Sequence, residues 1–428
     1  MGLKNYVKAL DLKVLAMGII VLFPLYRLHW NSYTLLLLAS ILLYQNLNSR
    51  ESRSVLRKRM RENGRLFFKS TLVFYPFLFS LLYTENISIG SKSIQYILPL
   101  ILIPFLIFFF TEALSKKQLV VLLVTFLIGC LLHSLYLNYT FFELGLYEDF
   151  QKATFYKLPF REAVMNLSFE SLHPTYVSLW YCFAIIFALY QIRVQASLGR
   201  KILFGMSIFP LLGTIVLLSS RIGFLCLLVL IPYYLLTVEN RKMRILFLTC
   251  FLGLTVFSIF KISFISSRVV TEFQETELKA PIGKKHNSIN IRIGIYECAL
   301  ALIKQNFLLG VGIGDVQSKL DSCYAKYDTD VYQNDNYNSH NYFLHVFLVA
   351  GLLGLLALLY MFFFFLRIAV TGKSFLYGSF LVVILLGMFF ENILSRNHGV
   401  LFFALFNTLF VQFYLKEKNA YRGHSTLS

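Results

Sequence analysis

Long unbroken apolar runs constrain this chain more than any other feature of its sequence. Each run is close to the length of one membrane-crossing helix, which needs about 20 apolar residues. Of the 428 residues, 57% are hydrophobic and only 14% are charged, whereas soluble domains carry roughly 25% charged residues. This composition excludes a soluble enzyme, a disordered chain and a secreted domain held together by disulfides. A β-barrel is disfavoured because barrel strands are short and alternate between apolar and polar residues.

We therefore predict an all-α polytopic membrane protein with about 12 transmembrane helices. The expected helices cover residues 14–26, 32–47, 67–84, 94–111, 118–137, 175–192, 202–218, 222–237, 243–262, 341–366, 375–394 and 399–415.

Lys and Arg residues are distributed unevenly between the connections of these helices. If the N-terminus is cytoplasmic, the inside segments hold 23 of them, whereas the four short outside connections hold one each, Arg27, Lys92, Arg221 and Arg396. Because basic residues gather on the cytoplasmic side, both termini are predicted to be cytoplasmic. We interpret the basic run 50–65 as a loop that faces lipid headgroups. The net charge of +18 is likewise attributed to basic residues beside anionic headgroups, and no nucleic-acid partner is predicted.

Two outside connections are long, and the whole chain, 1–428, is predicted to form a single membrane domain that carries them. The smaller loop covers 138–174 and the larger one, between helices 9 and 10, covers 263–340. Within the larger loop, 291–307 has apolar residues at helical spacing and is predicted to be an amphipathic helix at the membrane surface. Cys298 and Cys323 lie in this loop and could form a disulfide if it is extracytoplasmic.

The first candidate catalytic residue is His340, in Asn338-Ser339-His340-Asn341 at the entrance to the tenth expected helix. If the helix includes His340, Gly351 and Gly354 share its face, about 20° and 40° away on opposite sides. Small residues allow a neighbouring helix to approach closely. The histidine is therefore predicted to lie above a packed seam at the outer membrane boundary.

Three arginines are predicted on the same side of the membrane. Arg221 follows Ser220 in a short connection, Arg292 lies near the start of the surface helix, and Arg396 precedes the last helix. A single arginine at the membrane rim can simply reach water by snorkelling. Three of them beside a histidine better fit a site for an anionic lipid headgroup, because guanidinium groups bind phosphate oxygens in bidentate fashion without a metal. His173, at the start of the sixth expected helix, is a supporting candidate.

Two other motifs are set aside. Asp328-Thr329-Asp330 has the spacing with which nucleotide-sugar glycosyltransferases hold a divalent ion, but it lies outside, where nucleotide sugars are absent, and we interpret it as a solvated loop. The segment 310–314, Gly-Val-Gly-Ile-Gly, lacks the preceding strand and the following Lys-Ser/Thr of a phosphate loop, so a flexible turn is expected. The scattered cysteines lack metal-ligand spacing, and neither a metal nor a cofactor is predicted.

His340-Asn341, nine further residues and Gly351-Leu352-Leu353-Gly354 match the H[NSQ]-x9-GxxG pattern of the bacterial O-antigen ligase and O-antigen polymerase superfamily. The resemblance to that family covers roughly 170–412. It includes three further segments: Ser220-Arg221-x-Gly223, the Arg292 segment leading to 308–312, and Glu391-Asn392 before Arg396. The first 130 residues resemble the family only in hydrophobicity. Where the family often has Trp, this chain has Tyr296.

The resemblance implies a GT-C-type glycosyltransferase of the bacterial inner membrane, with both long loops and the active site in the periplasm. It implies transfer of a glycan from undecaprenyl diphosphate to an acceptor hydroxyl, such as that of a lipid A core sugar, without metal. By motif, Arg221 and Arg292 correspond to the diphosphate-binding arginines. His340 corresponds to the essential histidine, which would deprotonate the acceptor hydroxyl for an inverting displacement. Supporting roles fall to Arg396, Asn341, Ser220 and His173.

Ligase, polymerase and protein O-oligosaccharyltransferase share this donor and differ in acceptor. Polymerases of the best-known type carry Arg-x10-Gly in two periplasmic loops. The candidate arginines 161, 268 and 292 are followed eleven residues later by Leu172, Lys279 and Ile303, so the pattern is missing and a ligase is favoured. A transporter of polyprenyl-linked glycans is the alternative from another class. Such proteins tend to place charge at mid-membrane and to show inverted repeats, and neither is seen in this sequence.

Overall fold

The computed structural model describes residues 12–143, 160–161, 164, 172–261, 266, 270, 274, 276–283, 286–334 and 336–425. Within these ranges the chain is helical and contains no β-strand. The first group of helices comprises α2 (Leu12–Val21), η1 (Phe23–Leu25), α3 (Leu28–Leu47), α4 (Arg50–Ser70), α5 (Phe74–Ser80), α6 (Ile87–Ile97), α7 (Pro99–Phe110) and α8 (Lys116–Glu143). The second group comprises α11 (Pro174–Val194), α12 (Leu198–Leu218), α13 (Arg221–Leu236), α14 (Arg241–Lys261), α17 (Ser288–Gln305), α18 (Val316–Tyr324), α19 (Val331–Asn334), α20 (Tyr342–Thr371), α21 (Phe375–Phe390), η3 (Ile393–Ser395) and α22 (Asn397–Ser425).

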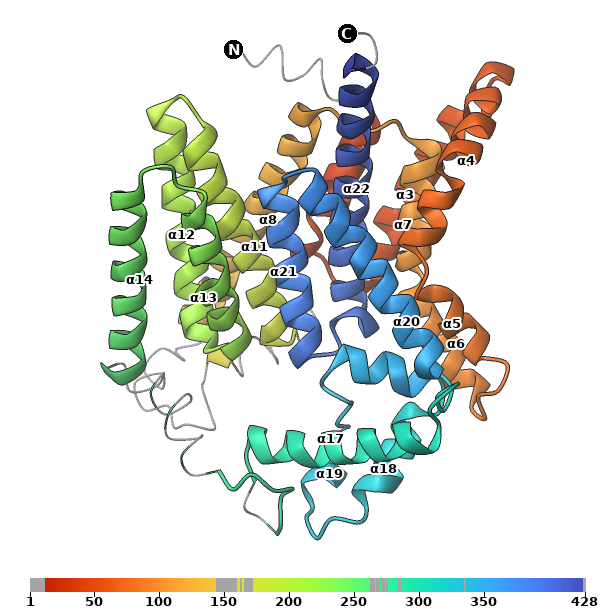
Figure 1. Cartoon of the computed structure of the whole chain (residues 1–428), viewed down its shortest axis with the longest axis vertical. Helices are drawn as coiled ribbons and strands as arrows, with labels where there is room; N and C mark the ends of the chain where they lie inside the picture. Colours follow the sequence, from red (N-terminus) through yellow and green to blue (C-terminus); the bar gives the residue numbers. More distant parts are fainter. Residues whose placement is uncertain are drawn as a thin grey trace.

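The long helices run side by side as a bundle, and α17 lies across one end of it with α18 and α19 (Figure 1). Six segments are long and apolar enough to cross a membrane: Ile87–Phe110, Lys116–Glu143, Pro174–Val194, Leu198–Leu218, Tyr342–Thr371 and Asn397–Lys416. Shorter apolar helices are Leu12–Val21, Arg221–Leu236 and Phe375–Phe390. Each predicted apolar run overlaps a helix, and the chain has the architecture of a multi-pass membrane protein.

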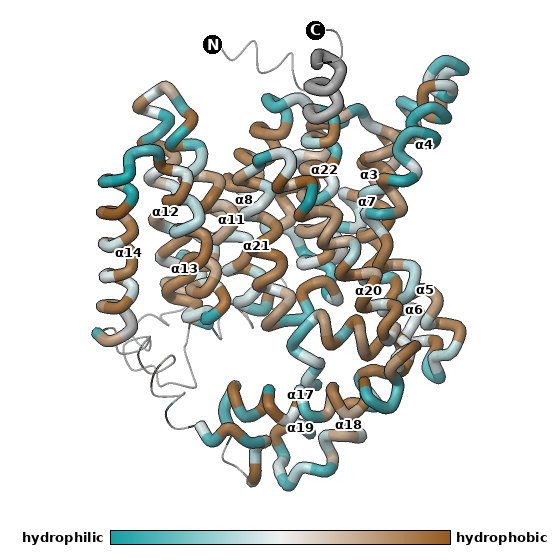
Figure 2. The backbone as a smooth tube through the Cα atoms, in the orientation of Figure 1, coloured by the Kyte–Doolittle hydropathy of each residue, from teal (hydrophilic) through white to brown (hydrophobic). Residues whose placement is uncertain are grey.

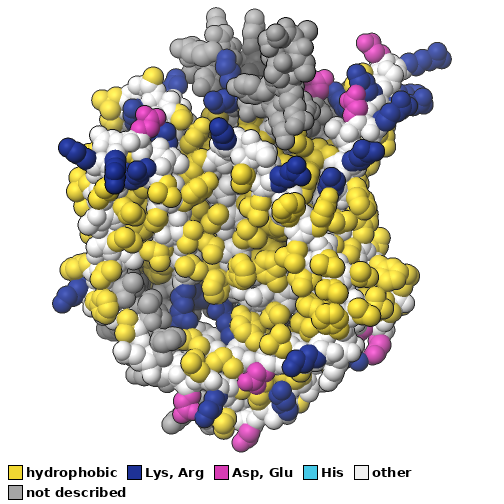
Figure 3. Space-filling model, in the orientation of Figure 1, with side chains coloured by type: hydrophobic (Ala, Val, Ile, Leu, Met, Phe, Trp, Pro, Cys, Tyr) yellow, Lys and Arg dark blue, Asp and Glu magenta, His cyan; other side chains and the backbone are white. Residues whose placement is uncertain are grey.

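The surface of the bundle is divided as a membrane would require. Hydrophobic residues dominate the middle of the helices, and hydrophilic residues gather at their ends (Figure 2). On the face shown in Figure 3, hydrophobic side chains form a broad belt, and Lys and Arg side chains crowd the end near α4. Exposing this much apolar surface to water would be energetically unfavourable, whereas contact with lipid tails is not.

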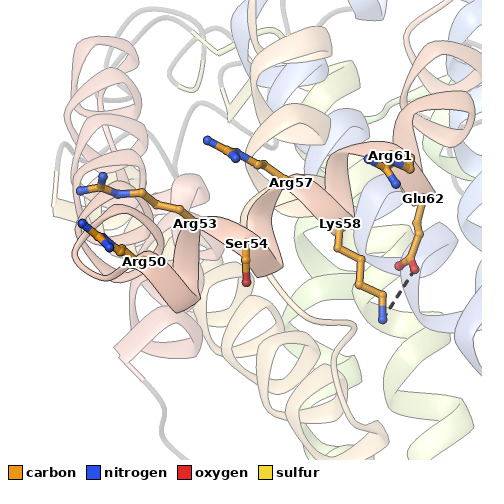
Figure 4. A pocket seen from close by; sticks show the side chains of 7 residues that line it. All are labelled: Arg50, Arg53, Ser54, Arg57, Lys58, Arg61 and Glu62. Carbon is orange, nitrogen blue, oxygen red and sulfur yellow. Dashed lines mark ion pairs between the residues drawn. The ribbon is translucent and has the colours of Figure 1, made fainter.

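The basic run 50–65 was predicted to be a loop, and this prediction is wrong, because the run forms most of helix α4. Ser49 caps the helix by accepting a hydrogen bond from the backbone N–H of Ser52 at 3.0 Å. Arg59 attaches the helix to the bundle through an ion pair of 2.8 Å with Glu112. Other basic side chains project from the helix (Figure 4), where Lys58 also pairs with Glu62. Most of the basic side chains of α4 are therefore exposed along one regular helix.

Helix α11 forms the centre of the membrane-embedded core. It packs against α12, α13, α21 and α8, and Trp180, Tyr181, Phe183 and Phe187 are fully buried. Gly223 of α13 approaches Ser178 so closely that an added Cβ would lie 3.0 Å from the Ser178 Cβ. This close approach brings the outer ends of α11 and α13 together, where His173 and Arg221 lie.

Helix α20 is broken at Gly351, whose φ of +60° and ψ of −155° are accessible to glycine and strained for other residues. The break leaves the carbonyls of Leu348 and Val349 without their helical donors. The backbone N–H groups of Val311 and Gly312 bond to them at 2.7 and 3.1 Å. Every backbone group must find a partner when buried, so the break is a docking point for the segment 307–312.

Two predictions about this region are wrong for that reason. The Gly-Val-Gly-Ile-Gly segment is hydrogen-bonded and closely packed instead of being a flexible turn. Helix α20 begins at Tyr342 and bends at Gly351, so His340, Gly351 and Gly354 do not share one helical face.

Helix α17 confirms the predicted helix near 291–307, but its apolar side faces protein. Ile295, Cys298 and Ala299 are buried, the Tyr332 hydroxyl donates to the Ile291 carbonyl at 2.8 Å, and Cys298 forms a disulfide with Cys323 of α18. The apolar spacing therefore marks the core of a small outer layer, instead of the predicted contact with the membrane surface.

Buried Asp315 joins this outer layer to the bundle. Its carboxylate accepts hydrogen bonds from the Thr84 hydroxyl and the Glu85 N–H at 2.7 Å each, and from the Asn86 N–H at 3.0 Å. These donors lie in the connection between α5 and α6. The anchor fixes the end of the outer layer that follows α17.

Candidate functional site

His340 and Glu391 form the central pair of the candidate site. Nδ1 of His340 lies 3.0 Å from Oε2 of Glu391. The Glu391 side chain is 7% exposed and that of His340 is 20% exposed. Glu391 follows the last residue of α21, and His340 precedes the first turn of α20. The packing of α20 on α21 therefore brings together two residues that are 51 positions apart.

The backbone around His340 is held in one conformation by side chains. His340 has a φ of +42°, in the left-handed region that costs a non-glycine residue energy. Its N–H donates to the Asn338 side-chain oxygen at 2.8 Å. Ser339 exchanges hydrogen bonds with the Asn392 amide at 3.0–3.1 Å. Because hydrogen bonds of the neighbouring residues hold this strained backbone conformation, the imidazole of His340 has a defined direction.

Glu391 is ionised although it is buried. Burial raises the pKa of its carboxyl, but the hydrogen bond and charge of His340, the charge of His173 and the Asn392 N–H together lower it to well below its usual range. An ionised carboxylate can only accept, so the His340 Nδ1 carries the proton and donates it. In the neutral imidazole with this tautomer, the other ring nitrogen, Nε2, has a lone pair that can accept a proton from a bound molecule.

His173 lies in the same electrostatic cluster. Burial lowers the pKa of His173 to about 4, the charge of Glu391 opposes this shift, and the charges of Arg161 and Arg396 strengthen it. Its Nδ1 accepts from the Thr175 N–H at 3.4 Å and caps α11. His173 is consequently neutral at physiological pH and contributes a buried polar side chain near His340.

Arg221 and Arg292 are related through one face of α17. The Nη1 of Arg221, the first residue of α13, donates to the Ser288 hydroxyl at 2.9 Å. Ser288 is the first residue of α17, and Arg292 follows one turn later, about 40° around the same face. Arg292 therefore lies one turn along α17 from the residue that Arg221 contacts, although 70 residues separate the two arginines in the chain.

The same face of α17 continues to the histidine. Tyr296 lies one further turn along, and its hydroxyl is 3.5 Å from the His340 carbonyl oxygen. Burial raises the pKa of Tyr296, the charge of Arg292 lowers it and the charge of Glu391 raises it. Ser288 and Tyr296 are about 12 Å apart along the helix at 1.5 Å per residue. Arg221, Arg292 and the His340–Glu391 pair therefore follow one another along a single helix.

Basic side chains can be seen at the bottom of a hollow between the bundle and the α17 layer (Figure 3). Positive charge in a hollow walled by protein concentrates anions more strongly than the same charge on an open surface. Arg396, which directly follows η3, is exposed and adds positive charge beside His173. Within the described ranges, no three His, Cys, Asp or Glu side chains are grouped as metal ligands would be.

Two of the predicted supporting residues have roles in helix capping. Ser220 caps α13 by accepting from the Gly223 N–H at 3.4 Å, directly before Arg221. Asn341 caps α20 by accepting from the Leu344 N–H at 3.1 Å, and its amide donates to the Phe389 carbonyl at 3.1 Å. Each cap therefore lies directly next to a candidate functional residue, which is Arg221 for Ser220 and His340 for Asn341.

Glu391 as the partner of His340 is the functional feature that sequence reasoning missed. One signal could have revealed it, because Glu391 is the only acidic residue between Asn336 and Lys416. A single carboxylate at the end of an apolar helix must find a partner, and His340 was one of the candidates predicted on the same side.

A family model described as O-antigen ligase matches residues 206–359. The matched segment contains Arg221, Arg292 and His340, and ends before Glu391 and Arg396. Comparison with curated protein sequences gives no match.

Proposed function

We propose that this protein, which belongs to the O-antigen ligase family, is a glycosyltransferase that moves a glycan from undecaprenyl diphosphate to an acceptor hydroxyl. The family supports a role of the ligase or polymerase type for a multi-pass membrane protein. The acceptor that we propose is a sugar of the lipid A core. The observation that carries the proposal is the alignment of two arginines and an oriented histidine along α17.

The proposed reaction is a direct inverting displacement. His340 Nε2 takes the proton of the acceptor hydroxyl while the hydroxyl oxygen attacks the anomeric carbon of the glycan. The bond between that carbon and the diphosphate oxygen breaks, and undecaprenyl diphosphate leaves with the bonding electrons. Arg221 and Arg292 neutralise the charge that develops on the leaving group. Glu391 stabilises the imidazolium that forms, and Arg396 contributes positive charge to the donor site.

The proposed location is the bacterial inner membrane, with both termini cytoplasmic, about 12 membrane-spanning helices in a GT-C-type arrangement, and the site on the periplasmic face. The disulfide between Cys298 and Cys323 supports this orientation, because disulfides persist in oxidising compartments. The basic helix α4 supports it as well, because basic segments remain cytoplasmic.

A transfer assay with several acceptors tests the proposal. Purified full-length protein would receive an undecaprenyl-diphosphate glycan together with rough lipopolysaccharide, with a candidate acceptor protein, or with no other acceptor, each with and without EDTA. We expect product on lipopolysaccharide, in equal amounts with EDTA. Elongated donor would indicate a polymerase, and glycosylated protein an oligosaccharyltransferase. No product with any acceptor, despite donor binding, would overturn the transferase and favour a transporter.

A further inference from the structure

A narrow groove lies at the end of the bundle opposite α17, between α4, α20 and α22. It has a volume of about 200 Å³ and is lined by Lys69, Tyr360, Phe363, Phe364, Arg367, Ile368, Thr371 and Leu415. Arg367 is one turn from the end of α20, and Leu415 directly precedes the end of the span Asn397–Lys416. The groove is thus at the depth where hydrocarbon gives way to headgroups.

The groove contains two positive charges without an acidic partner. Lys69 and Arg367 line it, and within the part of the chain that the structure describes neither residue forms an ion pair. The Lys69 ammonium lies 5.4 Å from the centre of the Phe364 ring, a cation–π contact that holds it over the groove. Two fixed cations at one headgroup-level site favour a phosphate group.

The groove changes from apolar to basic along one stripe of α20. Tyr360, Phe363, Arg367 and Thr371 recur at intervals of three or four residues, and therefore lie on one face. Tyr360 is 46% exposed and Phe363 is 61% exposed, so both rings are available to a lipid chain. From Tyr360 to Arg367 the helix rises about 10 Å. An amphiphile with an acyl chain below its phosphate has the same order of groups.

We propose that this groove binds one anionic glycerophospholipid, with its phosphate on Lys69 and Arg367 and an acyl chain along Tyr360 and Phe363. The lipid would join α4 to α20 at the opposite end of the bundle from the His340 site. The proposal does not depend on glycosyl transfer, because it uses none of the residues of that site.

Lipid binding to the full-length protein would be measured by native mass spectrometry, with phosphatidylglycerol as the probe and phosphatidylcholine for comparison. We expect tighter binding of phosphatidylglycerol, and a roughly 25-fold loss in the double variant Lys69→Gln/Arg367→Gln, because each charge is worth about fivefold. Arg367→Lys should keep most of the affinity. Lys373→Gln, which removes a charge at the same end of α20 but outside the groove, should change it by less than about twofold.

Several results would overturn the assignment. Equal binding of phosphatidylcholine, or equal loss in Lys373→Gln and the double variant, would show that the groove does not select an anionic lipid. Displacement by inorganic phosphate at similar concentrations would show a phosphate site without a lipid. Tighter binding of undecaprenyl phosphate that is lost in the double variant would assign the groove to a polyprenyl carrier. A thermal unfolding scan of each variant shows that the loss is not caused by misfolding.

Discussion

The Nδ1 atom of His340 and the Oε2 atom of Glu391 lie 3.0 Å apart at the outer end of the helix bundle. This contact fixes which imidazole nitrogen carries the proton, and so which one is available to a substrate. It also gives the buried carboxylate a hydrogen-bond donor, which its burial requires. The same contact therefore stabilises the buried Glu391 carboxylate and orients the His340 imidazole for the proposed proton transfer.

Replacing Glu391 with Gln should impair the chemical step more than substrate binding. Glutamine keeps the shape of the side chain but removes the charge that stabilises the imidazolium. We expect kcat to fall by at least about 100-fold while the KM for the donor changes little. Steady-state kinetics in proteoliposomes measure both quantities. A rise in donor KM with unchanged kcat would assign Glu391 to donor binding.

Replacing Arg292 with Lys should weaken donor binding although the charge is kept. Lysine cannot reproduce the two parallel hydrogen bonds of a guanidinium group on a phosphate. We expect kcat/KM for the donor to fall by about tenfold or more, as for one lost hydrogen bond to a charged group. The matched control is Arg27→Lys, at an exposed cap of α3. If both variants lose the same activity, positive charge on this side acts without a specific contact.

Replacing Asp315 with Ala should loosen the outer layer. Three donors lose their acceptor, and a buried donor left unpaired, such as the Thr84 hydroxyl, costs about 1–3 kcal/mol. We expect a lower temperature of thermal unfolding in detergent and faster proteolysis of the segment between α17 and α20. Asp321 of α18 is exposed, and its carboxylate accepts a hydrogen bond from the Gln317 side-chain amide at 2.8 Å, so Asp321→Ala provides the control. Equal unfolding temperatures for the two variants would refute the anchoring role.

Acid should destabilise the protein partly through His173. Its folded-state pKa of about 4 lies below its ordinary value of 6.5, so between these values the unfolded chain binds the extra proton and the folded state does not. Stability is then complete above pH 6.5 and falls as the pH drops towards 4. His173→Asn keeps a capping side chain without the titrating group. Its unfolding temperature should fall less between pH 7 and pH 4.5 than that of the wild type, and equal slopes would exclude His173 as a source of acid sensitivity.

The sequence predicted the helices better than their ends and contacts. Apolar runs such as 175–192 and 341–366 are long enough to require helices in a membrane, whatever their neighbours. The predicted start of the tenth helix at 341 lies one residue before the observed start at Tyr342. The shared face of His340 with Gly351 was wrong, because the Asn341 cap and the strained φ of His340 depend on local hydrogen bonds that hydropathy does not reveal. The basic run became a helix because Arg and Lys are good helix formers once Ser49 caps them.

Contacts between distant segments could not be predicted from one sequence. Asp315 meets Thr84 across 231 residues, and Glu391 meets His340 only because α21 packs on α20. Arg221 and Arg292 were predicted on the same side of the membrane, but their shared relation to α17 needed the Ser288 contact. Residue type and topology thus indicated which side chains to consider, and helix packing determined which of them meet.

The most direct test of the central proposal is a single-turnover transfer measurement on His340→Ala beside the wild type, with saturating donor and rough lipopolysaccharide. If His340 is the base, the rate of product formation should fall by at least about 100-fold, while the donor affinity measured in the same preparation stays within about twofold. A variant that forms product at the wild-type rate would contradict the account.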